Sequence, residues 1–189
     1  MKEIGLSTAI STTFSVSPNP HIPKFPDEDT PGVNELMAAL GKVIVALNVL
    51  DFEIKAATAF VLNPINPDLM HPEITTKRPL EQRADFLATV SRNALGQNTS
   101  GADKLKAHLD LVSGLARIRN KLAHSFLYRS GNGFMFQKFE KKFESRVATA
   151  DDLTLDSLTL LAWTMDFANL FGSLFPNYSS WYIRQTTPD

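Results

Sequence analysis

Cysteine is absent from this chain of 189 residues. Its absence excludes a disulfide framework, a thiolate nucleophile and any zinc or iron–sulfur site held by cysteine. A chain without cysteine suits a reducing compartment, and we expect the protein in the cytoplasm. A large charge of either sign is absent too, because the net charge is −1. This balance excludes a uniformly basic protein that coats nucleic acid, but it leaves room for a local basic surface.

Long apolar runs without charge are missing. The segment from Ile4 to Val16 is interrupted by serine and threonine, so it does not form the apolar core of a secretion signal. The most apolar stretch, Leu153 to Phe175, contains Asp156 and Asp166, and each would be costly inside a bilayer. We therefore expect no secretion and no membrane partner, and we predict that this stretch is a buried helix.

Signatures of metal and nucleotide sites are missing as well. The four histidines show no ligand spacing, no group of acidic residues suggests a two-metal site, and no glycine-rich phosphate loop is found. We therefore expect a protein that uses neither a metal ion nor another cofactor.

Apolar residues are plentiful enough, at 43% of the chain, for one sizeable core. Their spacing predicts an all-α fold, an up-down bundle of about four to five helices with a small β-hairpin between the third and last long helices. Residues 1–32 hold five prolines and little apolar periodicity, so we expect an extended arm there. A helical domain is expected over residues 33–175, followed by a C-terminal tail over residues 176–189.

The limits of the individual helices are predicted from the spacing of apolar residues and from residues that typically begin or end a helix. We predict a first helix over residues 33–62, which two Asn-Pro pairs end, and a second over residues 80–95, which a glycine ends. A third helix is expected from about residue 102 to residue 126. A Ser-Gly-Asn-Gly sequence then favours a hairpin within residues 126–148. Thr-Ala-Asp-Asp begins a last helix that reaches residue 174.

The third helix carries an unusual set of polar residues near its C-terminal end. Because a helix advances about 100° per residue, Arg117, Asn120 and His124 lie within about 60° of one another, beside the apolar stripe. Arg119 lies inside the stripe, where packing alone would favour leucine. Burial of an unpaired guanidinium is expensive. Arg119 therefore needs a carboxylate, a solvent-filled cleft or an interface.

A carboxylate partner is available on the first helix. Its apolar stripe has Asp51 in the middle, with Glu53 nearer one edge. We predict that Asp51, or failing that Glu53, pairs with Arg119 and fixes its orientation. The alternative is a buried ion pair that only sets the register of the two helices.

Positive charge is concentrated around this helix end. From Arg117 to Arg146 there are eight lysines and arginines and two glutamates, so this segment has a net charge of +6. Since the net charge of the whole chain is −1, the rest of the chain has a net charge of −7. This asymmetry indicates a basic surface for RNA. The alternatives are that the interleaved phenylalanines pack on the helices and that the lysines form a solvated strand edge. The candidate RNA-binding residues are Lys121, Tyr128, Arg129, Lys138, Lys141 and Lys142.

The string Arg119-Asn120-Lys121-Leu122-Ala123-His124 ends a third helix that precedes a hairpin and a last helix. In this setting it resembles the Arg-to-His motif of the HEPN superfamily, over roughly residues 33–174. The resemblance implies a homodimer in which the third helices bring two motifs into one cleft. It also implies a metal-independent endoribonuclease of a toxin–antitoxin, phage-defence or stress system. The implied catalytic residues are Arg119, Asn120 and His124, and the expected supporting residues are Asp51, Glu53 and Arg117.

The side-chain chemistry of this motif agrees with RNA cleavage. Histidine, with a pKa of about 6.5, can take the proton of a ribose 2′-hydroxyl, and arginine can stabilise charge on the phosphorane, which gives a 2′,3′-cyclic phosphate. Considered alone, His124 would be a surface or helix-capping residue. HEPN domains also include silent interaction modules and RNA- or nucleotide-binding domains, which remain the alternative. The expected partners are RNA and an antitoxin or nucleotidyltransferase-like protein.

Overall fold

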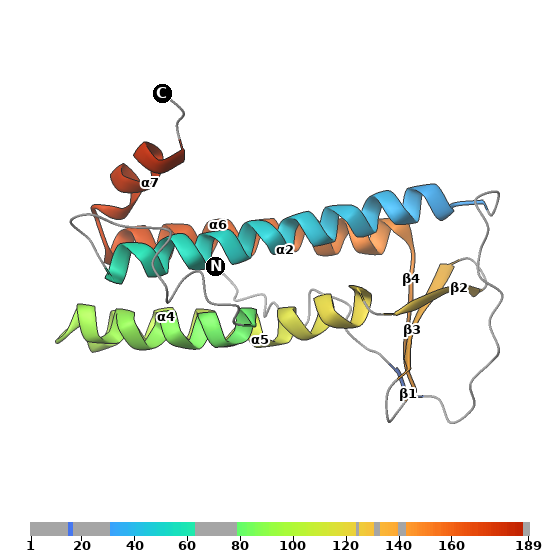
Figure 1. The fold of residues 1–189 in the computed structure, drawn as a ribbon, viewed down its shortest axis with the longest axis horizontal. Helices are drawn as coiled ribbons and strands as arrows, with labels where there is room; N and C mark the ends of the chain where they lie inside the picture. The colour runs from blue at the N-terminus through green and yellow to red at the C-terminus, as the bar shows by residue number, and fades with distance from the viewer. Residues whose placement is uncertain are drawn as a thin grey trace. The chain divides into compact units, whose positions relative to one another are not determined.

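The computed structural model describes residues 15–16, 31–62, 79–123, 125–130, 133–139 and 143–186. This described part is mainly helical, as the sequence predicts (Figure 1). Its helices are α2 (Val33–Leu62), α4 (Leu80–Leu95), α5 (Thr99–Ala123), α6 (Ala150–Leu174) and α7 (Tyr178–Thr186). Its strands are β1 (Ser15–Val16), β2 (Phe126–Ser130), β3 (Gly133–Phe139) and β4 (Phe143–Ala148).

The chain divides into two compact units, although one core was expected. The first, here called the sheet unit, consists of Met1–Leu47 and Arg117–Leu161. The second, here called the helical unit, consists of Asn48–Ala116 and Ala162–Asp189. The helices α2, α5 and α6 each contribute residues to both units.

The sheet unit contains the predicted hairpin and enlarges it. Strands β2 and β3 are antiparallel and close on the pair Ser130 and Gly133. Strand β4, which was not expected as a separate strand, pairs antiparallel with β3, and β1 from the N-terminal arm pairs with β4. Phe134 and Phe136 are buried, so the prediction that hairpin phenylalanines serve packing is confirmed for these two.

Helix α6 begins with a reciprocal cap. Thr149 Oγ1 accepts a hydrogen bond of 3.1 Å from the backbone N–H of Asp152, and the Asp152 carboxylate accepts one of 2.8 Å from the backbone N–H of Thr149. The exchange satisfies two backbone donors at the helix start, and the carboxylate lies at the positive end of the helix dipole. The predicted helix start is confirmed, within a few residues, by these contacts.

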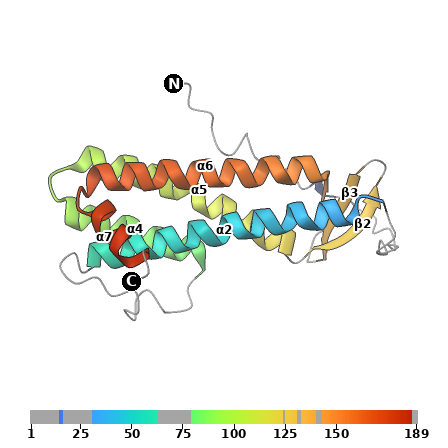
Figure 2. The ribbon, with the colours of Figure 1, turned by 90° about the horizontal axis from the view of Figure 1, so that it is seen from above.

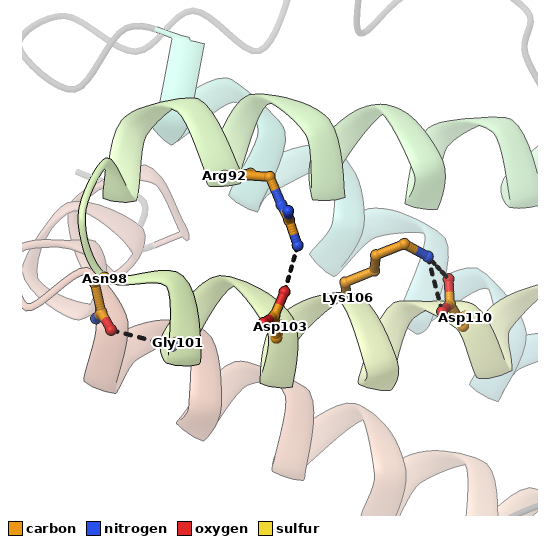
Figure 3. Close-up of polar contacts among 6 residues, drawn as sticks. All are labelled: Arg92, Asn98, Gly101, Asp103, Lys106 and Asp110. Carbon is orange, nitrogen blue, oxygen red and sulfur yellow. Dashed lines mark hydrogen bonds and ion pairs between the residues drawn. The ribbon is translucent and has the colours of Figure 1, made fainter.

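In the helical unit, α4 and α5 form an antiparallel pair. Helix α4 ends at Gly96, whose φ of 57° favours glycine and whose N–H bonds to Arg92 O at 3.2 Å. The side-chain oxygen of Asn98 then accepts a 3.0 Å hydrogen bond from Gly101 N at the start of α5. Figure 3 shows this cap, with ion pairs from Arg92 to Asp103 and from Lys106 to Asp110.

Helix directions in the helical unit depart from strict up-down alternation. Helix α6 is antiparallel to α5, because His108 stacks on Trp163 while Leu174 covers Gly101. Helix α4 instead starts beside the middle of α2, where Arg83 contacts Asp51. Within this unit α4 therefore runs in the same direction as α2, as both views of the ribbon show (Figures 1 and 2).

A row of aromatic rings follows α6 in the helical unit. Trp163, Phe167, Phe171 and Phe175 are spaced four residues apart, and successive ring centroids lie 6.0, 5.9 and 4.6 Å apart. His108 of α5 stacks on Trp163 with its ring centroid 4.3 Å away. Because four residues make slightly more than one helical turn, the row stays on one face of α6 and forms the centre of this core.

Residues 178–186, expected as part of a tail, form helix α7 instead. Tyr178 and Trp181 are buried, and both rings contact Phe60 of α2, at centroid distances of 5.5 and 5.7 Å. Tyr178 also meets Phe171 edge to face. Aromatic spacing of three and four residues gives α7 one apolar side, and that side explains why a short helix is stable here.

Among helices in the described part of the chain, α2 is the one long and apolar enough to cross a membrane by length and composition. The cores of soluble proteins contain helices with the same property, and this finding is weak support for a membrane span. The prediction that Leu153 to Phe175 is the most apolar stretch was wrong, because among the described helices α2 meets this criterion and α6 does not.

Replacing the capping threonine tests the start of α6. Thr149→Ala removes a side-chain acceptor from the first turn, and we expect the free energy of unfolding in urea to fall by about 1 kcal/mol. Thr159→Ala, in the middle of the same helix, is the matched control and should be close to neutral, because alanine favours helix. An equal loss in both variants would contradict a capping role for Thr149.

Candidate functional site

The Arg-to-His motif lies at the C-terminal end of α5. The helix continues through Ala123, so helical spacing applies to Arg117, Arg119, Asn120 and Lys121. For residues 117–123 the structure describes the backbone only, and His124 lies outside the described residues. Strand β2 begins at Phe126, so the motif directly precedes the sheet, as expected.

The buried stripe of α5 leads toward Arg119. Leu105 and Val112 are both fully buried, at 0% exposure, and Arg119 follows Val112 by the same seven residues that separate Val112 from Leu105. Seven residues return a helix to within about 20° of the starting direction. Asn120 falls at the edge of the same stripe by this spacing, and Arg117 falls on the side of the exposed Lys106 and Asp110. The helix is continuous through these positions, and burial of the Arg119 side chain stays a prediction from the spacing.

Candidate RNA-binding residues are distributed over the strands. Tyr128 and Arg129 belong to β2 and Lys138 belongs to β3, whereas Lys141 and Lys142 lie outside the described residues. The register pairs Arg129 with Phe134 and Arg146 with Phe136. Residues that face each other across strands lie on the same face of a sheet, so the positions of Arg129 and Arg146 share the face of the buried Phe134 and Phe136, whereas Tyr128 shares the other face with Met135.

The Asp51 carboxylate, the first predicted partner of Arg119, contacts two cations of the helical unit. One oxygen contacts the guanidinium of Arg83, and the other lies 2.7 Å from Lys55 Nζ. The Asp51 side chain is 24% exposed and that of Arg83 is 18% exposed. The group is therefore half-buried at the α2–α4 contact, where both carboxylate oxygens have a partner.

The Glu53 carboxylate, the second predicted partner, binds two phenol groups of α7. Tyr178 donates a hydrogen bond of 3.3 Å to one oxygen, and Tyr182 donates a shorter one to the other. Glu53 is 8% exposed and so lies deeper than Asp51. The sequence placed Asp51 nearer the centre of the apolar stripe than Glu53, but Glu53 is the more buried of the two, because α7 covers it.

Pairing of either acid with Arg119 stays a prediction, because the Arg119 side chain lies outside what the structure describes. The partners that the acids do have were not anticipated. Tyr178 and Tyr182 could have been found from the aromatic spacing of residues 178–182, which is typical of a packed helix. Arg83 was harder to find as a partner from the sequence, which shows only a cation beside the apolar stripe of α4.

Burial and the neighbouring carboxylate change the acidity of both phenols. Burial, followed by the charge of Glu53 and the hydrogen bond to it, raises the pKa of Tyr178 well above its ordinary value. Burial, followed by the hydrogen bond to Glu53 and its charge, raises the pKa of Tyr182 in the same direction. Both phenols therefore remain protonated, and donate to Glu53, above the pH at which a free phenol ionises.

His108 is the one described histidine, and packing explains its position. Its ring stacks on Trp163, and desolvation lowers its pKa, partly offset by the Trp163 carbonyl and the Asp166 charge. Within the described residues, no group of three or more His, Asp or Glu side chains is placed to hold a metal ion.

Comparisons with protein-family models, with curated proteins and with solved structures found no match to this chain. The resemblance to HEPN domains therefore stays a prediction that rests on the motif in the sequence.

A double-mutant cycle measures what Asp51 binds. Asp51→Asn and Arg83→Met should each lower the free energy of unfolding, and the double variant should reveal a coupling of about 1 kcal/mol between a half-buried pair. The same cycle with Arg119→Met tests the predicted pairing of Asp51 and Arg119. Zero coupling to Arg83 would contradict the contact seen between α2 and α4.

Alkaline unfolding tests the phenol–carboxylate group. Because the pKa of Tyr178 and of Tyr182 is raised in the folded state, stability is complete below about pH 10, where the unfolded phenols are protonated too, and it falls as the pH rises further. Tyr182→Phe should make this fall shallower in urea titrations. Tyr128→Phe, which removes the remaining tyrosine, is the control, and an equal effect from both would contradict the assignment.

Proposed function

We propose that the protein is a metal-independent endoribonuclease that acts as a homodimer, with Arg119, Asn120 and His124 of two third helices in one cleft. The observation that carries the proposal is that Arg119 to Ala123 of the motif form the end of α5, shortly before the strands of a segment with surplus positive charge. RNA is the proposed substrate because this segment of +6 offers phosphate partners in an otherwise acidic chain.

Proton transfer by histidine is the chemical core of the proposed reaction. His124 takes the proton of a ribose 2′-hydroxyl as its oxygen attacks the adjacent phosphorus. The bond from phosphorus to the 5′ oxygen breaks, and a protonated imidazole supplies the proton that this leaving oxygen needs. The products are a 2′,3′-cyclic phosphate and a 5′-hydroxyl. Two motifs in one cleft would provide a base and an acid together, because an ordinary histidine populates both forms near pH 6.5.

Arg119 is proposed to stabilise negative charge on the phosphorane. Its place on the line of Leu105 and Val112 calls for a polar surrounding. Both predicted acid partners already hold other groups, since Asp51 contacts Arg83 and Glu53 contacts Tyr182. These contacts favour the alternative that a shared cleft at a dimer contact accommodates the guanidinium.

The cellular role follows from the same proposal. An RNase of this kind fits a toxin–antitoxin, phage-defence or stress system in the cytoplasm, with an antitoxin or a nucleotidyltransferase-like protein as a partner. The chain has no cysteine, which is compatible with a reducing compartment. A catalytically silent interaction domain is the second candidate, and the exposed apolar residues of α2 and α6 favour it.

RNA cleavage in the presence of EDTA tests the proposal. The purified protein should cut single-stranded RNA and leave 2′,3′-cyclic phosphate and 5′-hydroxyl ends. His124→Ala should slow cleavage by at least about a hundredfold, the usual contribution of a general base or acid, while it remains folded. His71→Ala, at a histidine outside the motif, is the matched control and should cut at the original rate.

Two results would contradict the proposed reaction. The first is cleavage that EDTA abolishes or that leaves 3′-hydroxyl ends, because both indicate a metal-assisted mechanism. The second is the absence of cleavage by the unaltered protein at every RNA concentration, together with weaker self-association of His124→Ala. That combination would identify the motif as part of an interaction domain.

A further inference from the structure

The outer face of α6 carries an exposed apolar stripe. Leu155, Leu158 and Met165 are 59%, 58% and 66% exposed, and Leu161 is exposed beside them. Together with the exposed Ala162, the first three follow one another at intervals of three, four and three residues. These are the intervals at which one helix packs along another. The residues opposite them on α6, such as Leu160 and Phe167, are buried, so the stripe is a second apolar side of the same helix.

Charge is missing from this face. Between Asp152 and Asp166, α6 has one charged residue, Asp156, and Asp156 is 3% exposed. At roughly 180 Å² for a fully exposed Leu or Met, the four large side chains present about 400 Å² of apolar surface, which is the scale of the largest patches on monomers and is commonly functional. Such a face is expected to be covered.

We infer that the stripe of α6 binds the same stripe of a second copy of this chain, with the two helices antiparallel. A twofold axis midway between Leu158 and Ala162 sets Leu158 of each copy opposite Ala162 of the other. The same axis sets Leu155 opposite Met165. Leu155, Leu158 and Met165 thus each meet an apolar neighbour, and Leu158, near the axis, faces the smallest residue of the stripe, as close helix packing requires.

The charges at the ends of α6 select the antiparallel arrangement. Asp151 and Asp152 lie in the first turn of the helix. A parallel pair in register would bring these acids together with their own copies, and like charges at such distances repel. In the antiparallel pair Asp151 lies opposite Asn169, which is exposed and uncharged. The helix dipoles also oppose one another in this arrangement.

The same charges argue against a lipid surface or a nucleic acid as the occupant. Helix α6 contains no lysine or arginine, and its exposed charges are all acidic. Helices that lie on membranes, and surfaces that bind nucleic acid, need cations around the contact.

A stable dimer needs more area than α6 alone provides, since a standard interface takes about 800 Å² from each partner. Within the sheet unit, the N-terminal half of α2 lies beside that of α6 (Figure 2). Met37 and Val45 of this half are 50% and 60% exposed. They add exposed apolar surface to the helix beside α6. The contact does not depend on catalysis, and it differs from the α5 contact of the proposed ribonuclease.

Single cysteines provide the test, because the chain has none of its own. Leu158→Cys and Ala162→Cys variants are purified separately, mixed and oxidised. The antiparallel pair predicts a disulfide-linked dimer in the mixture and little in either variant alone, because two copies of residue 158 are displaced by about 6 Å along the axis, which exceeds what a disulfide tolerates. Strong linkage of Leu158→Cys to itself, or none in the mixture, would overturn the proposal.

Light scattering during gel filtration gives an independent measurement. Leu158→Asp should remove the α6 contact and halve the molar mass of the parent oligomer, whereas Leu111→Asp, at an exposed leucine of α5, should leave that mass unchanged. The reverse result would assign the contact to α5 and overturn the proposal. The proposal would also be overturned if the parent chain were monomeric, or if it bound phosphatidylcholine vesicles through Leu158. If the two cysteine variants form the disulfide but the unaltered protein does not cleave RNA, the α6 contact is supported and the proposed ribonuclease activity is refuted.

Discussion

The row of aromatic rings on α6 is the interaction on which the helical unit depends. Trp163, Phe167, Phe171 and Phe175 present one continuous face, and each neighbouring element meets it or its extension. Helix α5 meets it through His108, and α7 meets it through Tyr178. Helix α2 joins through Phe60, which contacts Phe175. Large rings bury much area with little loss of side-chain entropy, so a few of them can fix four helices.

Helix limits were the part of the fold that the sequence predicted best. Helices α2 and α4 begin and end where apolar period, Asn-Pro pairs and Gly96 indicate. Those signals are local, and they act within a few residues. Strand β4 and helix α7 were missed because their stability comes from distant partners. Strand β4 depends on its ladder with β3, and α7 depends on Phe60 and Glu53 of α2. Propensity alone does not carry that information.

The candidate site shows the same division between local and distant information. Periodicity correctly put Arg119 to Ala123 at the end of a helix, because seven-residue spacing is a property of that helix alone. The partners of the two acids on α2 depend on which helices lie beside it, and here the sequence argument was incomplete. It identified Asp51 and Glu53 as charges that need partners, and both have them. It did not identify Arg83 or the tyrosines, since that requires knowing that α4 starts beside the middle of α2 and that α7 covers Glu53.

The division of the helical unit along the chain has a consequence for synthesis. Its residues come from Asn48–Ala116 and Ala162–Asp189, with a segment of the sheet unit between them. A nascent chain that has emerged only as far as α5 lacks the aromatic row and the cover over Glu53. The helices α2, α4 and α5 must therefore wait, with apolar faces uncovered, until α6 and α7 leave the ribosome. The helical unit is therefore expected to close only after α7 has emerged, and chaperones compete for those faces until then.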